Sequence, residues 1–95
     1  MKNRITDVQI IPVKPKDGLV AFANIVYDDN LFLGSIGVYT RPGGDYRLTY
    51  PKKGSRDGFN VFHPINRSTG QEIHDAVIAK YEKVNQEIQK MRQEL

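Results

Sequence analysis

The sequence predicts a small α+β fold, in which an antiparallel β-sheet of four to five strands precedes one long C-terminal α-helix. Two observations lead to this class. Short runs of strand-forming residues alternate with tight turn signals over the first two-thirds of the chain. After residue 70, apolar residues instead recur at spacings of three and four, the period of a helix. A chain of 95 residues has the size of one domain, so we expect a single domain over 1–95, with the sheet over about 5–62 and the helix over about 69–93.

Turn signals divide the sheet region into strands. Asp, Asn, Pro and Gly cluster at 16–18, 28–30, 42–44 and 56–58. Between these turns we expect strands at 8–13, 19–27, 31–39 and 46–50, with a short fifth strand at 60–62. Connections this short suit hairpins, so the strands should form an antiparallel meander. In the fourth strand, Tyr46, Leu48 and Tyr50 alternate with Arg47 and Thr49, which assigns the two sets to opposite faces.

The second and third predicted strands are apolar on both faces. In the second strand, side chains alternate between the two faces of the sheet. One face should hold Leu19, Ala21, Ala23 and Ile25, and the other Val20, Phe22 and Val26. One helix can cover only one face of such a sheet. A second copy of the chain is the simplest cover for the other face, so we expect a homodimer.

The helix should begin near Thr69, because Ser68 with Gln71, or Thr69 with Glu72, fits a capping box. Its apolar stripe consists of Ile73, Val77, Tyr81, Val84, Ile88, Met91 and Leu95. From Val77 onward the stripe follows the heptad spacing of a coiled coil. A helix about 38 Å long would extend past a compact sheet. Val84, Ile88 and Met91 are therefore candidates for a dimer interface; the alternative is that the stripe packs on the chain's own sheet.

The positive charge is concentrated in the middle of the chain. The net charge is +3, and the segment from Arg41 to Arg67 holds six basic and two acidic residues. Within it, Lys52, Lys53 and Arg56 lie close together in a loop beside glycine and serine, a composition that suits phosphate binding. Arg41 and Arg47 are expected neighbours across a hairpin. The alternative is a solvated loop whose lysines only keep the protein soluble.

The residue pattern argues against catalysis, so we do not expect an enzyme. The chain has no cysteine, and its two histidines lack the spacing of a zinc site. We interpret His63 as a structural hydrogen-bonding residue and His74 as a surface residue. No serine has an evident partner base, and no glycine-rich loop has the following lysine of a nucleotide-binding loop. We expect no cofactor, no metal and no small-molecule substrate.

The sequence also predicts a cytoplasmic protein. No stretch reaches the roughly 18 apolar residues of a membrane span, so we expect no membrane partner. The first residues, Met1 to Asp7, lead into polar sequence and not into the apolar core of a signal peptide.

Four short motifs follow one another along the chain. They are Ile5-Thr6-Asp7-Val8; Pro51-x-Lys53 with Asp57-Gly58; His63-Pro64-Ile65-Asn66 followed by Ser68-Thr69; and Ile73-x-Asp75-Ala76-Val77 with Tyr81. In their order and spacing these motifs resemble the sporulation stage V protein G (SpoVG) family of small bacterial regulators, over roughly residues 5–83. The resemblance implies an antiparallel sheet followed by a helix, a homodimer, and DNA and RNA binding without catalysis, with a link to gene regulation, sporulation and septation.

The basic loop departs from the family pattern. The family loop resembles Pro-Ser-Lys-Arg-Thr-Pro-Asp-Gly, in which Lys53 matches the lysine but Gly54 stands where the arginine would be. Lys52 and Arg56 add cations nearby, and the stretch between Gly58 and His63 is shorter than usual. These changes affect which nucleic-acid sequence the loop would prefer more than they affect its overall charge.

Two functions from different classes follow. The leading hypothesis is a dimeric regulator that binds DNA or RNA through Lys52, Lys53, Arg56, Arg41 and Arg47. The alternative is a protein-interaction module whose long helix docks a division or regulatory partner. Tyr46 or Tyr50 would stack on an unpaired base if either ring were exposed.

Overall fold

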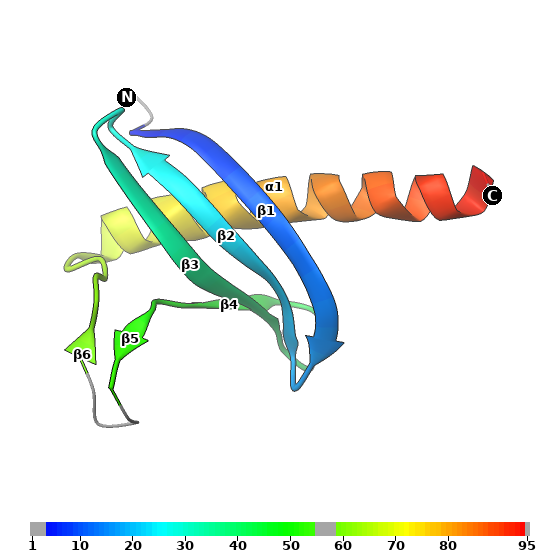
Figure 1. Cartoon of the computed structure of the whole chain (residues 1–95), viewed down its shortest axis with the longest axis horizontal. Coiled ribbons are helices and arrows are strands. Elements are labelled where there is room, and N and C mark those ends of the chain that lie inside the picture. Colours follow the sequence, from blue (N-terminus) through cyan, green and yellow to red (C-terminus); the bar gives the residue numbers. More distant parts are fainter. Residues whose placement is uncertain (1–3, 55–58, 95) are drawn as a thin grey trace.

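The computed structural model describes residues 4–54 and 59–94. Its elements are β1 (Ile5–Lys16), β2 (Leu19–Tyr27), β3 (Leu31–Thr40), β4 (Tyr46–Thr49), β5 (Lys52–Lys53), β6 (Phe59–Asn60) and α1 (Arg67–Glu94). The first four strands form one antiparallel sheet in the order β1-β2-β3-β4. The predicted α+β class, the meander and the C-terminal helix are therefore confirmed (Figure 1).

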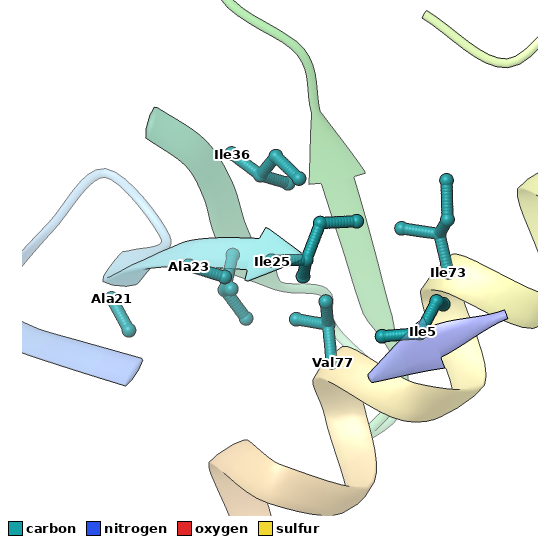
Figure 2. Close-up of a cluster of buried hydrophobic side chains, with 8 residues drawn as sticks. Ile5, Ala21, Ala23, Ile25, Ile36, Ile73 and Val77 are labelled. Atoms are coloured by element: carbon teal, nitrogen blue, oxygen red, sulfur yellow. The ribbon is translucent and has the colours of Figure 1, made fainter. Parts of the chain in front are cut away.

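The helix α1 crosses one face of the sheet, and the core lies between them (Figure 1). The fully buried side chains come from the middle strands and the first half of the helix, and Ile5 closes one end (Figure 2). They are Ile5, Ala21, Ala23, Ile25, Ile36, Val38, Ile73 and Val77. Alanines at 21 and 23 let the helix approach β2 closely, while each isoleucine contributes about 1.5–3 kcal/mol by leaving water.

The fourth strand follows its predicted alternation. Tyr46, Leu48 and Tyr50 pack against the core, while the neighbouring Arg47 is exposed. The ring of Tyr46 meets the ring of Tyr81 on α1 edge to face, with centroids 5.6 Å apart. This contact ties β4 to the helix.

A β-bulge changes the predicted facing at the start of β2. Leu19 pairs with Tyr39 but Ala21 pairs with Val38, so the register shifts between the two pairs. As a result Val20 packs against the core, whereas Leu19 lies over Gly37 on the opposite face. The prediction that Leu19 shares a face with Ala21, and Val20 with Phe22, was therefore wrong. Ala21, Ala23 and Ile25 lie on one face, as expected.

The sheet face opposite α1, here called the open face, carries exposed apolar side chains. Ile11 of β1 pairs with Phe22 of β2, and the two are 49% and 37% exposed. Phe32 of β3, which pairs with Val26, is 67% exposed. The sequence expectation of a sheet that is apolar on both sides thus holds, and no described element of the chain covers this face (Figure 1).

The helix begins two residues earlier than predicted, and a different side chain caps it. The Oδ1 atom of Asn66 accepts a hydrogen bond from the Thr69 amide at 2.8 Å and another from the Ser68 hydroxyl at 3.0 Å. Asn66 is therefore the N-cap, three residues before the amide that it binds. The predicted capping boxes of Ser68 and Thr69 were wrong, because both residues already lie within the helix. Glu72 instead accepts a hydrogen bond from the Arg4 amide at 3.2 Å.

Candidate nucleic-acid interface

Two very short strands form an arm that projects from the body of the protein. We define this arm as residues 51–54 and 59–61. Its strands β5 and β6 form a separate two-stranded sheet, which extends away from β4 (Figure 1). The fifth strand was predicted at 60–62; the structure places it at Phe59–Asn60 and pairs it with Lys52–Lys53, which the sequence suggested to be a loop.

Contacts at the base hold the arm to the domain. The Val61 amide donates a hydrogen bond to the Pro51 carbonyl oxygen at 2.7 Å. Just behind it, the rings of Tyr50 and Phe62 meet edge to face, with centroids 5.8 Å apart. Both rings are partly buried against the core. The arm is therefore an extension of β4 that the aromatic pair fixes to the sheet.

The side chains beyond this base are exposed. The register places Lys53 opposite Phe59 and Lys52 opposite Asn60. Because side chains alternate along a strand, Lys53 and Phe59 share one face of the arm, and Val61 joins them two residues further on. Phe59 is 83% exposed and Val61 is 63% exposed. The arm thus presents a cation beside an aromatic ring, both open to solvent.

The four predicted phosphate-binding residues that the structure describes do not lie together. Lys52 and Lys53 are on the arm, whereas Arg41 belongs to the β3–β4 turn at the opposite end of β4 (Figure 1). Arg41 lies 3.9 Å from Asp45, in an exposed ion pair. The guanidinium of Arg47 lies over the ring of Tyr39, 5.1 Å from its centroid, on the open face of the sheet. Arg56 lies outside the described residues.

The two tyrosines proposed for base stacking are partly buried against the core. Tyr46 packs on Tyr81 and Tyr50 on Phe62, as described above. Burial raises the pKa of the Tyr50 phenol above its ordinary value. Burial, followed by the neighbouring Tyr46, likewise raises the pKa of Tyr81. The idea that Tyr46 or Tyr50 would stack on a base was conditional on exposure, and their burial removes it.

On the arm, the exposed ring is that of Phe59, which the sequence did not single out. A signal was present: Phe59 is separated from Lys53 by a turn-forming stretch, as in a hairpin. Strands of two residues show no periodicity, however, so the pairing of Lys53 with Phe59 could be found only in the structure.

The far half of α1 faces the chain's own sheet as far as Ile88. Val84 and Ile88 are partly buried and line a groove of about 230 Å³ whose other wall includes Pro12, Val13 and Val20. Met91 is 66% exposed. Of the three candidate dimer-interface residues, the structure therefore leaves Met91 exposed and places Val84 and Ile88 along the groove opposite the β1–β2 hairpin. Leu95 lies outside the described residues.

The histidines occupy structural positions. Nε2 of His74 lies 3.4 Å from the Tyr46 carbonyl oxygen, and Nδ1 lies 3.6 Å from the Asp75 carboxylate. His74 is therefore half-buried between α1 and β4, and its prediction as a surface residue was wrong. Nδ1 of His63 lies 3.1 Å from the Pro64 carbonyl oxygen. Within 4–54 and 59–94, no three histidine or acidic side chains are grouped so that they could hold a metal ion.

A membrane-spanning helix is also absent from these residues: α1, the one helix described, is too polar to cross a bilayer.

Comparison with known proteins identifies the family. The SpoVG family model matches residues 3–83. Three similar proteins each bear the name "Putative septation protein SpoVG". The protein from Alkaliphilus oremlandii is 30% identical over 83 residues, which cover 86% of this chain and 89% of that one. The protein from Clostridium acetobutylicum is 30% identical over 86 residues, covering 88% and 90%. The protein from Treponema denticola is 35% identical over 80 residues, covering 83% and 86%. The chain therefore belongs to the SpoVG family.

Proposed function

We propose that this protein is a dimeric regulator that binds DNA or RNA in the bacterial cytoplasm, with its arm as the main contact to phosphates. The observation that carries the proposal is the arm itself, which holds Lys52 and Lys53 out in solvent. Among the described residues, neither lysine takes part in an ion pair. The names of its relatives connect the family to septation, and we extend that role to this chain as control of septation or sporulation genes.

The physical basis is counterion release. Each lysine that neutralises a phosphate frees condensed cations from the nucleic acid, so binding weakens steeply as salt is added. One arm offers few cations. A dimer would present two arms, and the second would bind at the effective concentration set by the first.

The dimer that we propose forms through the open face of the sheet. Ile11, Phe22 and Phe32 leave apolar surface exposed there, and large exposed apolar patches mark interaction sites. The distal helix is the second candidate surface, but Val84 and Ile88 already face the β1–β2 hairpin. Pairing the open faces leaves both arms free, because the arm projects beyond the sheet (Figure 1).

A salt titration tests the nucleic-acid proposal. Affinity for random-sequence DNA and RNA is measured at several salt concentrations for the parent, for Lys52→Ala with Lys53→Ala, and for a matched control. The control is Lys83→Ala with Lys90→Ala, which removes two exposed lysines from α1. We expect the arm variant to bind all sequences more weakly and to lose about 0.7–0.9 of the log–log salt slope per phosphate contact. Equal slopes for parent and arm variant would overturn the assignment.

The alternative function, a protein-interaction module, has one observation in its favour, the exposed Met91 near the end of α1. The same titration separates the two functions. An apolar helix interface loses little affinity in salt, whereas binding to phosphates loses it steeply. A parent protein that binds neither DNA nor RNA at low salt would favour the interaction module.

A further inference from the structure

We propose that the arm binds an unpaired nucleotide, with its base stacked on Phe59 and an adjacent phosphate at Lys53. This inference rests on the proposed nucleic-acid function and deepens it: the ligand is single-stranded DNA or RNA, and Phe59 makes the contact that selects it. The main observation behind this inference is that Lys53 and Phe59 are directly opposite each other on the two strands of the arm.

The exposure of Phe59 is the first step of the argument. A large aromatic side chain is normally buried, yet the ring of Phe59 is 83% exposed. At the base of the arm the chain does partly bury an aromatic residue: Phe62 packs edge to face on Tyr50. The fold thus uses Phe62 to hold the arm and leaves Phe59 without a role in the core.

The position of Lys53 is the second step. Residues directly opposite in an antiparallel pair have Cβ atoms about 5 Å apart, so the ammonium of Lys53 and the ring of Phe59 serve one small site. Lysine is depleted from the centres of protein–protein interfaces. Single-stranded nucleic acid, in contrast, requires this combination, since its bases stack on aromatic rings while cations follow its backbone.

The third step distinguishes a single strand from a duplex. In a duplex each base is stacked between its neighbours, and its flat face is closed to a protein ring. An unpaired base offers that face, and every base has one, so the contact tolerates many sequences. The arm should therefore bind single strands more tightly than duplexes of equal charge.

The test compares a short oligo(dT) or oligo(U) strand with a blunt-ended duplex of two complementary strands that carries the same total number of phosphates. Affinities are measured at one salt concentration for the parent, Phe59→Ala, Phe59→Leu and Phe59→Trp. We expect Phe59→Ala and Phe59→Leu to weaken single-strand binding about 5- to 150-fold, the range for one stacked base. Phe59→Trp should retain it, and all variants should bind the duplex as the parent does.

Two controls separate stacking from a general loss of apolar surface. Ile65→Ala truncates another apolar side chain, which is 89% exposed and lies outside the arm, and it should change neither affinity. The chain has no tryptophan, so the tryptophan emission of Phe59→Trp comes from position 59 alone. We expect the single strand, but not the duplex, to quench the emission of the tryptophan in Phe59→Trp. Met91→Trp places a tryptophan at a remote exposed position, and its emission should respond to neither nucleic acid.

The outcomes distinguish this inference from the function on which it rests. If the parent binds neither nucleic acid, both fail. Suppose that the parent binds nucleic acid. If Phe59→Ala then loses affinity for the single strand and the duplex equally, or loses affinity for neither of them, only the stacking site fails. A fall in the molar mass of Phe59→Ala in solution would also overturn it, because Phe59 would then belong to an interface between protein chains.

Discussion

The ring of Phe62 meets the ring of Tyr50 edge to face at 5.8 Å, across the base of the arm. Tyr50 follows β4 directly, and Phe62 leads toward α1. The pair therefore links the sheet, the arm and the start of the helix at one point, and the arm's direction depends on it.

Replacing Phe62 with leucine should loosen the arm while leaving every cation in place. An aromatic pair of this kind contributes about 0.5–1.5 kcal/mol beyond its buried area, so we expect Phe62→Leu to lower the free energy of unfolding by about that amount. Hydrogen exchange of the Val61 amide, which donates to Pro51, should accelerate more than exchange of core amides. A uniform acceleration across the sheet would show that Phe62 supports the whole domain and not the arm in particular.

Asn66→Ala should destabilise the helix start. Loss of an N-cap typically costs about 1 kcal/mol, and urea denaturation measures it. Asn66→Asp keeps an acceptor for the Thr69 amide and should restore most of the stability. Ser68→Ala, which removes the side chain that the sequence suggested as the cap, should have a smaller effect than Asn66→Ala. The reverse order would return the capping role to Ser68.

Alkaline pH should destabilise the protein through its partly buried phenols. Burial raises the pKa of Tyr50 above its ordinary value of 10.0, and burial followed by Tyr46 raises that of Tyr81. The folded state thus holds these protons more tightly than the unfolded state does. The resulting stability is complete below about pH 10 and is lost as the pH rises through the folded pKa.

Denaturant titrations at successive alkaline pH values, with phenolate absorbance followed in parallel, measure this loss. Tyr50→Phe should make the fall in unfolding free energy less steep, since it removes one of the titrating groups. If Tyr50→Phe follows the same curve as the parent, Tyr50 ionises equally easily in both states and the burial argument fails.

Charge placed on the open face should break the proposed dimer. We expect Phe32→Glu and Phe22→Glu to give the mass of a monomer, 10.8 kDa, by light scattering at concentrations where the parent is a dimer. A buried charge without a partner is strongly unfavourable at an apolar interface. Met91→Glu is the matched change on the exposed end of α1 and should leave the dimer intact. The opposite pattern would move the interface to the helix.

The larger elements could be predicted because their periodicities are long. The apolar stripe from Ile73 to Ile88 repeats over four turns, and the alternation in β4 separates Tyr46 and Leu48 from Arg47. Both signals reflect which side chains meet the core, and the structure shows this for Tyr46 and Leu48 of β4 and for Ile73, Val77 and Tyr81 of the stripe. The open face was also predictable, since no single helix could cover both sides of β2.

Local register could not be predicted in the same way. The bulge between Leu19 and Ala21 reverses the facing of Val20, and nothing in the alternating apolar run marks it. Another lies in β3, where Ser35 adopts a positive φ of 63° and its amide donates to the Asn24 side chain at 3.0 Å. Asn66 was likewise overlooked, because Ser68 and Thr69 are equally good caps in sequence terms.

The candidate site was predicted only in part. The lysines were found because charge is visible in the sequence, but Arg41 and Arg47 were expected to be their neighbours across a hairpin. The structure places Arg41 in the turn before β4 and Arg47 within β4 beside Tyr39, whereas both lysines lie on the arm beyond the other end of β4. Phe59 was missed because its exposure depends on where a two-residue strand pairs, which is a property of the folded hairpin.

The order of the main sheet leaves β1 as an outer strand, with β2 as its one neighbour in that sheet. Such edges can recruit further strands and grow into fibres, and proteins commonly prevent this with proline. β1 has Pro12 and Pro15 in its second half, and neither residue has an amide proton to offer an incoming strand. The two prolines thus let the chain keep a long outer strand while resisting growth into an open-ended polymer through that edge.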